Sequence, residues 1–544
     1  MKTIIGAAIG NCVHVAGLYH FLKMAESEGY RTISLGPAVQ IKRLLAFIEE
    51  NRPDIVAISY RLTPESAAEL FRELKTGLQT ENKTSCRMIF GGTPPVAGIA
   101  RNSGIFEHVF DGSEPEAEIR RFLGGSRGSG STGAYPDNLI DRINGKYPYP
   151  VIRHHFGRPS MEETLKGVAM ISESGVLDVL SVGPDQNAQE HFFHPKEMDH
   201  SQDGAGGVPL RNPGDLEAIY KISRRGNFPL VRCYSGTNDL MKWAEMNVKT
   251  IHNAWAAIPL GWYSVMDGRS KRSIEDAIIE NLEVIRWYAG KGIPVEINES
   301  HQWSLRDAHD SLAVAMAFLA AYNAKMAGVK HYVAQFMFNN PPGTSPEMDI
   351  AKMLAKKELI EELEDKTFII FREVRAGLAH FLSSPSFAQG QLAASTVISL
   401  ALKPHILHVV GYSEGDHAIL PEELIQSCNI AHGVLHDTLF GMPDMTDNKR
   451  VTERKTELKK EARYLLEAIK KSGSDISDDP WSDPVTLARA IRSGLLDTPH
   501  FQGNPHLCGK ILTRMSEGAW YATDRKTGKI LTEKERISLI DNIT

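Results

Sequence analysis

A histidine in the loop that follows the first apolar segment is the residue best placed for metal chemistry. Residues 3–9 form an apolar run typical of a buried strand, and residues 18–28 have the spacing of a helix that ends at Gly29. His14 therefore lies between strand and helix, at the edge where open α/β sheets bind ligands. A neutral imidazole there can ligate a metal, and the plain alternative is an ordinary loop histidine.

Small and polar residues follow two further predicted strands. Ser59 ends the predicted strand 54–59, and Gly91, Gly92 and Thr93 follow the predicted strand 88–90. A strand is also predicted at 33–36 and a helix at 44–51. Because the carboxyl ends of parallel strands meet at one edge, we expect these loops to lie beside His14.

At these positions the chain resembles the cobalamin-binding domain of B12 enzymes in which a protein histidine replaces the cofactor's own base. That family carries Asp-x-His-x-x-Gly, then Ser-x-Leu, then Gly-Gly. The resemblance implies that His14 binds the cobalt and that Ser59 and the glycines line a channel for the displaced nucleotide tail, since glycine permits close approach. The implied cofactor-binding set is Cys12, His14, Gly17, Ser59, Arg61, Thr63, Gly91, Gly92 and Thr93.

Two positions depart from the family pattern. Cys12 stands where the family has the aspartate that hydrogen-bonds the ligand histidine, which alters the groups that tune the ligand. Arg61 stands where the family has an apolar residue.

Composition limits the function classes. A chain of 544 residues is too long for one hydrophobic core, and a net charge of -6 gives no case for nucleic-acid binding. The five cysteines form no CxxC pair, which argues against a zinc knuckle or disulfide framework and fits a reducing compartment. No apolar run reaches membrane-spanning length, so we expect a soluble, cytoplasmic protein without a membrane partner.

The expected architecture is α/β with a flavodoxin-like (Rossmann-type) domain followed by a (β/α)8 TIM barrel. We expect the first domain over residues 1–123, a flexible Gly/Ser linker over 124–148, the barrel over 149–445 and a small α+β extension over 446–544. Strands are predicted at 179–182, 230–233, 248–251, 295–297, 332–335 and 405–410, with a helix at 313–327. An open doubly wound sheet is the alternative. In the extension, a charged helix with a solvated face is predicted at 450–471, and a hairpin is predicted at 520–529.

The barrel and tail resemble the large subunit of glutamate (methylaspartate) mutase, an adenosylcobalamin-dependent isomerase. The matching stretches are 180–185, 228–239, 292–299, 324–330, 416–421 and 496–528. That family binds two substrate carboxylates with arginines, but Gln189 and Tyr234 stand at two of those positions here, and Tyr263 matches loosely. The candidate substrate residues are Gln189, Tyr234, Tyr263, His301, Arg306 and His417. With two positive charges replaced, glutamate is not the expected substrate.

Three functions follow from these patterns. The first is an adenosylcobalamin-dependent radical isomerase acting on a small acid or amino acid other than glutamate, and the resemblance implies a homodimer. The second is a corrinoid-binding protein without mutase activity, in methyl transfer, as a carrier or as a sensor. The third is a scaffold that has lost cobalamin. His191 and His194 have the spacing of metal ligands, which allows a second metal site. The alternative is that both are surface histidines.

Overall fold

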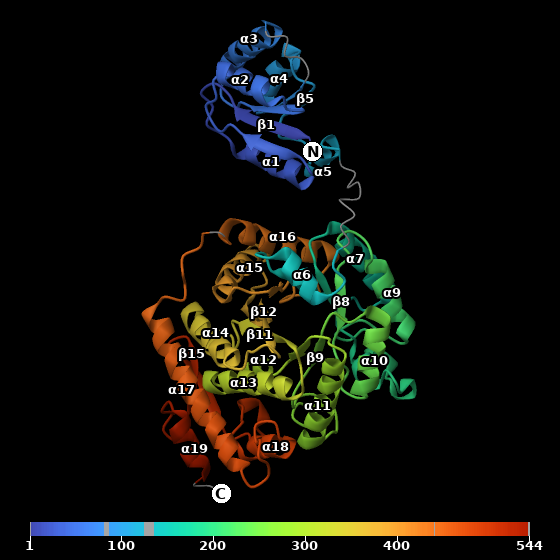
Figure 1. Ribbon diagram of the computed structural model, residues 1–544, viewed down its shortest axis with the longest axis vertical. Coiled ribbons are helices and arrows are strands. Elements are labelled where there is room, and N and C mark those ends of the chain that lie inside the picture. Colours follow the sequence, from blue (N-terminus) through green and yellow to red (C-terminus); the bar gives the residue numbers. More distant parts are fainter. Residues whose placement is uncertain (1, 81–85, 125–134, 440, 542–544) are drawn as a thin grey trace. The chain divides into compact units, whose positions relative to one another are not determined.

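The structure is a computed structural model that describes residues 2–80, 86–124, 135–439 and 441–541 (Figure 1). The chain divides into two compact units, Met1–Ala134 and Tyr135–Thr544. Residues 125–134 of the predicted linker lie outside the described residues. The predicted linker is wrong beyond them, because helix α6 (Leu139–Lys146) buries Leu139 and Ile143 in the second unit.

The first unit is a five-stranded parallel sheet covered by helices on both faces. Its strand order is β2-β1-β3-β4-β5, the flavodoxin-like order. The strands are β1 (Thr3–Ala8), β2 (Arg31–Ser34), β3 (Ile55–Ser59), β4 (Arg87–Gly91) and β5 (His108–Phe110). Helices α1 (Ala16–Ser27) and α5 (Glu116–Phe122) cover one face, and α2 (Ile41–Asn51), α3 (Pro64–Thr80) and α4 (Pro94–Ser103) cover the other (Figure 1).

The register of this sheet brings the predicted loops to one rim. Ala8 pairs with Ser59, and Ser59 pairs with Gly91, so the loops after β1, β3 and β4 leave the sheet at the same level. The order of the strands reverses between β1 and β3, which is where such sheets open a crevice for ligands.

The second unit is a TIM barrel of eight parallel strands surrounded by helices (Figure 1). The strand order β8-β7-β6-β13-β12-β11-β10-β9 places each strand beside its neighbours in the chain. The two end strands approach each other through the hydrogen bond from the Ala254 amide to the Val231 carbonyl, at 3.0 Å. The barrel is therefore nearly closed, and the open-sheet alternative is wrong.

The barrel strands alternate with helices along the chain. The strands are β6 (Val151–His155), β7 (Val179–Val182), β8 (Leu230–Cys233), β9 (Ala256–Ile258), β10 (Val295–Ile297), β11 (His331–Phe338), β12 (Ile369–Ala376) and β13 (Ile406–His408). The outer helices are α7 (Met161–Ser174), α9 (Pro213–Ser223), α10 (Leu240–Ile251), α11 (Ile274–Gly290), α13 (Asp310–Met326), α14 (Pro346–Glu361), α15 (Pro385–Ser399) and α16 (Pro421–Thr438).

The strand predicted at 248–251 is wrong. Those residues are the last turn of α10, whose buried Leu240, Trp243, Asn247 and Ile251 recur at helical spacing. The barrel's fourth strand is β9, only three residues long, and it follows this helix after a short turn.

The C-terminal extension packs on the barrel helices instead of standing apart. It consists of α17 (Lys449–Ser472), α18 (Pro484–Ser493), β14 (Leu512–Ser516), β15 (Ala519–Thr523) and α19 (Glu533–Asp541). Helix α17 has two faces: Val451, Leu458, Leu465 and Ile469 bury one of them in the core, and charged residues leave the other exposed. The hairpin joins 512–516 to 519–523, one strand earlier than predicted. Among the described helices, none combines the length and apolar character needed to cross a membrane.

Candidate cofactor and substrate sites

The loop between β1 and α1 presents one imidazole to solvent. His14 is exposed, whereas Cys12 is fully buried and its Sγ lies 3.8 Å from His14 Nδ1. The loop is held by two backbone hydrogen bonds, from Cys12 N to Ile9 O and from Ala38 N to Cys12 O. Since Nδ1 faces the thiol, Nε2 is the ring nitrogen left to bind a metal, and no described residue hydrogen-bonds it.

A cavity of about 480 Å³ opens beside His14 and runs between α1 and the sheet. Its inner wall is apolar and includes Phe21, Met24, Ala57 and Ile89. Its rim is polar and carries His14, Gly17, Ser59, Arg61, Gly91, Gly92 and Thr93. A slot with an apolar interior and a polar mouth suits a flat aromatic group on a polar tether, which is the chemistry of a nucleotide tail.

Two adjacent glycines shape this slot in different ways. A Cβ at Gly91 would meet nothing within 4 Å, so the missing side chain leaves free space where the slot lies. A Cβ at Gly92 would lie 2.5 Å from the carbonyl oxygen of Tyr60, so only glycine allows the loops after β3 and β4 to approach this closely. Both positions fit a bound nucleotide tail.

Two predicted residues, Cys12 and Thr63, do not line the slot. Thr63 Oγ1 accepts a hydrogen bond from Ser66 N at 3.3 Å, at the start of α3, which makes it a helix cap. Among polar side chains, the structure adds three lining residues that the motif does not contain, namely His20, Asp111 and Glu114. Asp111 and Glu114 follow β5, a strand that the sequence analysis did not predict.

Inside the barrel, alternate residues of each strand form three layers. The lowest layer is apolar and includes Val151, Val179, Leu230, Val333, Phe371 and Ile406. Two residues further along the strands lies a charged layer of Arg153, Ser181, Arg232, Glu296, Gln335, Glu373 and His408. Another two residues further lie His155, Gly183, Tyr234, Met337 and Arg375, at the carboxyl end, where TIM barrels hold their active sites.

The charged layer is internally balanced. Arg153 pairs with Glu373, and its Nε donates to Ser181 at 2.8 Å. Arg232 Nη1 lies 3.2 Å from Glu296, which also accepts from Trp255 Nε1 at 2.8 Å. Two arginines therefore face two glutamates, and the layer forms a rigid floor for the cavity above it.

A cavity of about 570 Å³ lies above this floor. Four of the predicted substrate residues line it: Gln189, Tyr234, Tyr263 and His301. Other polar residues line it too: Asn339, Asn340, Arg269 and Asp307, together with Arg375, Asn298 and Gln335, three residues that the sequence analysis missed as site residues. The signal for Arg375 was its spacing from Glu373, since residues two apart lie on the same face of a strand.

The other two predicted residues do not reach this cavity. Arg306 is stacked on the Trp262 ring, 3.9 Å from its centroid, and lies 3.5 Å from the Asp267 carboxylate. His417 is exposed and is held by Asp416 at 2.9 Å and Glu423 at 3.1 Å, two carboxylates that raise its pKa. Both side chains are committed to other partners.

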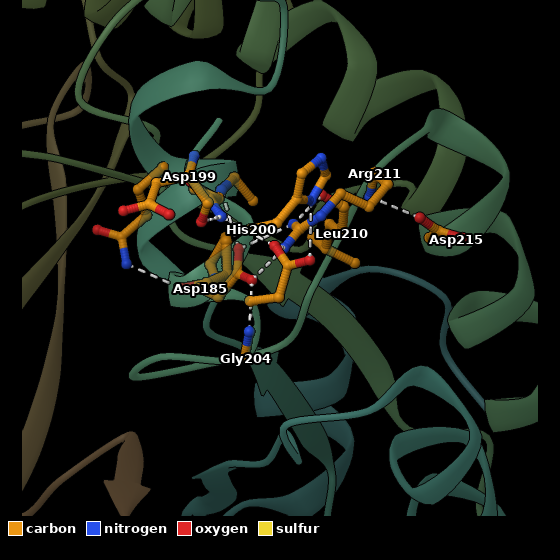
Figure 2. A network of polar contacts seen from close by, with 12 residues as sticks. Asp185, Asp199, His200, Gly204, Leu210, Arg211 and Asp215 are labelled. Carbon is orange, nitrogen blue, oxygen red and sulfur yellow. Dashed lines mark hydrogen bonds and ion pairs between the residues drawn. The ribbon is translucent and has the colours of Figure 1, made fainter. Parts of the chain in front are cut away.

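A polar network fastens the long connection after β7 that forms one wall of the cavity (Figure 2). The buried carboxylate of Asp185 accepts hydrogen bonds from Ala188 N at 2.9 Å and Gly204 N at 2.8 Å. Arg211 donates to both oxygens of Asp185 and also pairs with Asp203. The network holds Gly206 and Gln189 at the cavity, where Gln189 Nε2 donates to Pro184 O at 2.8 Å.

The second metal site weighed for His191 and His194 finds no support. His194 Nε2 pairs with Asp239 at 2.9 Å and His191 lies 3.5 Å from Glu190, both within a surface network. Across the described ranges, no group of three or more His, Cys, Asp or Glu has a metal-binding arrangement.

Comparison with known proteins concerns mainly the first unit. Residues 2–120 match the B12 binding domain family. A cobalamin-binding protein from Desulfitobacterium hafniense DCB-2 is 27% identical over 20% of this chain and 52% of its own, with a TM-score of 0.19. The chain thus spans about half the length of that protein.

A second solved structure extends over most of the chain. OxsB, a cobalamin-dependent S-adenosylmethionine radical enzyme, is 12% identical over 91% of this chain and 76% of its own, with a TM-score of 0.20. No curated protein matches the chain. The family match over residues 2–120 shows that the N-terminal unit is a B12-binding domain, joined in one chain to a TIM barrel.

Proposed function

We propose that this protein is an adenosylcobalamin-dependent isomerase that rearranges a small acid or amino acid other than glutamate. The observation that carries the proposal is the pairing of two sites in one chain. The B12-binding unit presents His14 beside an apolar slot, and the barrel encloses a polar cavity at the carboxyl ends of its strands.

The residues of the first unit fit a cobalamin bound through a protein histidine. His14 Nε2 would coordinate the cobalt, Cys12 would hold the other ring nitrogen, and the slot beneath Gly91 would take the nucleotide tail. When bound, adenosylcobalamin supplies a carbon radical through homolysis of its cobalt–carbon bond.

The barrel residues orient the substrate and shield it from water. The balanced charged layer below the cavity keeps the floor rigid, and the Asp185 network fixes one wall. Neither Gln189 nor Tyr234 carries a charge, so the cavity lacks the cations that the glutamate mutase pattern has at those two positions. No general base is required for hydrogen abstraction by a radical.

The test is the spectrum of the full chain with adenosylcobalamin. We expect a light-sensitive form with histidine ligation, and nitrogen superhyperfine splitting in the electron paramagnetic resonance spectrum of the Co(II) state. His14→Ala removes the splitting and severely weakens binding, whereas His20→Ala, at the other imidazole lining the slot, keeps the splitting. Splitting that persists unchanged in His14→Ala would exclude His14 as the ligand.

The corrinoid-binding alternative is favoured by one observation, the thiol of Cys12 in place of a carboxylate. Under that alternative the protein binds methylcobalamin or hydroxocobalamin. It gives no radical signal when adenosylcobalamin is added together with an acid, whichever acid is used. The same samples therefore decide between the two functions.

A further inference from the structure

We propose that Arg375 binds the single carboxylate of the substrate and that Tyr234 accepts a hydrogen bond from an ammonium or hydroxyl group on the same molecule. This inference rests on the proposed function and names its substrate class: a monocarboxylic acid bearing a nearby donor, such as a 2-amino or 2-hydroxy acid.

Arg375 carries the charge that the barrel interior leaves unpaired. It lies on the inward face of β12, two residues after Glu373, and lines the cavity. Its Nε donates to the Ala376 carbonyl at 3.2 Å, and none of the described carboxylates lies within 4.0 Å of its guanidinium. The charge of Glu414 raises the pKa of Arg375, but the Glu414 carboxylate accepts its hydrogen bond from Gly411 N, at 2.6 Å.

Burial makes this lone guanidinium a receptor for an anion. Removal from water lowers the pKa of Arg375, which means that its charged form is poorly solvated where it stands. A carboxylate that enters the cavity replaces the lost hydration, and the planar guanidinium binds it through two parallel hydrogen bonds.

Among the described residues that line the cavity, no second cation is as free of partners as Arg375. Burial, followed by the charge of Arg375, holds the pKa of His301 well below its ordinary value, so its imidazole is neutral. The Arg269 guanidinium also lines the cavity, but it is stacked 4.9 Å from the Tyr263 ring centroid and lies 3.9 Å from Asp267. Asp307 lines the cavity as well, and its carboxylate would repel a second substrate carboxylate.

Tyr234 is oriented as an acceptor by the residue beside it. Burial and then Arg153 hold the pKa of His155 well below its ordinary value, so the ring is neutral. The Tyr234 hydroxyl donates to His155 Nε2, and Arg153 Nη2 lies 2.9 Å from the same nitrogen and 3.4 Å from the Tyr234 oxygen. The Tyr234 O–H is thus occupied, and beside the long contact from Arg153 its oxygen keeps one lone pair for an N–H or O–H donor in the cavity.

Tyr234 and Arg375 line the same cavity. The cavity therefore presents a cationic donor and a neutral acceptor within reach of one small molecule, which is the pattern that an amino acid or hydroxy acid complements.

The test is calorimetric binding of five small probes to the full chain at millimolar concentration. We expect 2-aminobutyrate and 2-hydroxybutyrate to bind. Butyrate lacks the donor and 2-aminobutyramide lacks the carboxylate, so both should bind about tenfold more weakly or worse. Glutamate should bind no more tightly than 2-aminobutyrate.

Variants then assign the two contacts. Arg375→Gln should weaken 2-aminobutyrate about 10- to 100-fold and leave the amide unaffected, and Arg375→Lys should restore part of the loss. Tyr234→Phe should abolish the preference for 2-hydroxybutyrate over butyrate. Arg492→Gln, which changes an arginine paired with Glu275 outside the cavity, should bind like the parent.

The outcomes separate this inference from the function on which it rests. Three results would overturn the inference. They are equal affinity for probes with and without a carboxylate, unchanged affinity of Arg375→Gln for 2-aminobutyrate, and no binding of any acid. The cobalamin spectrum of Arg375→Gln should match that of the parent, since Arg375 lies in the barrel unit. Loss of histidine ligation in the parent chain would instead contradict the proposed function.

Discussion

Under the proposed function, Cys12 is the residue that would hold the ligand histidine, His14, in place. Its thiol is the described partner of His14 Nδ1, at 3.8 Å, and it is fully buried. A thiol is a weak hydrogen-bond partner, whereas a carboxylate accepts an imidazole N–H strongly and makes the ring a more basic ligand. Partners of this kind typically change metal affinity by about 10- to 100-fold.

We therefore expect Cys12→Asp to tighten cobalamin binding or leave it unchanged, and Cys12→Ala to weaken it. Titration of each full-length variant with hydroxocobalamin, followed by absorbance, measures the effect. Thermal unfolding without cobalamin checks that the new carboxylate, placed where the thiol is buried, has not damaged the fold. A large loss of affinity in a well-folded Cys12→Asp protein would show that the thiol itself is required.

At the scale of the element, the end of β4 keeps the slot open. Because Gly91 has free space in place of a side chain, Gly91→Leu is expected to fill the slot, with a loss of cobalamin affinity of about 10- to 100-fold. Gly98→Ala in α4 is the control, since a Cβ there also meets nothing and alanine suits a helix. Unchanged affinity in Gly91→Leu would mean that the nucleotide tail binds elsewhere.

Glu299 is a buried acid between β10 and helix α12 (Ser300–Ser304). Helix α12 carries the cavity residue His301. Glu299 accepts hydrogen bonds from Trp303 Nε1 and Leu260 N, both at 2.9 Å, and burial raises its pKa from 4.5 to about 7. Between these values the folded protein holds a proton that the unfolded chain releases. The Glu299 contribution to stability is therefore present below pH 4.5 and is lost as the pH rises to about 7.

Urea unfolding across this pH range tests the effect against Glu299→Gln, which does not titrate. We expect the unfolding free energy of the parent, relative to the variant, to fall by about 3 kcal/mol over the window. A relative stability that rises with pH would place the Glu299 pKa below its ordinary value and contradict the expectation.

Local motifs were predictable and barrel contacts were not. Ser59 and Gly91 come at the end of apolar runs and His14 follows another after a short loop, so their positions on the rim could be deduced from the chain alone. Arg375 was missed because its strand, β12, mixes charged and apolar residues and was not predicted. His417 and Arg306 were near predicted strand ends, but carboxylates and an aromatic ring elsewhere in the fold hold them away from the cavity.

At the scale of the whole molecule, the two units have separate hydrophobic cores. The buried clusters of the first unit contain no residue beyond Leu123, and those of the second begin at Leu139. A ligand held by one unit stabilises that unit alone unless it also binds the other. Cobalamin binding should therefore be visible as a selective effect on one part of the chain.

Scanning calorimetry of the full chain should accordingly resolve two transitions. The barrel unit is the longer, Tyr135–Thr544 against Met1–Ala134, so its unfolding enthalpy should be about three times that of the first unit. Cobalamin at about one hundred times its dissociation constant adds about 2.7 kcal/mol, which should raise the smaller transition by roughly 10 °C. His14→Ala should remove most of that rise while leaving the larger transition in place. Equal shifts of both transitions in the absence of substrate would show that the cofactor is bound by both units together.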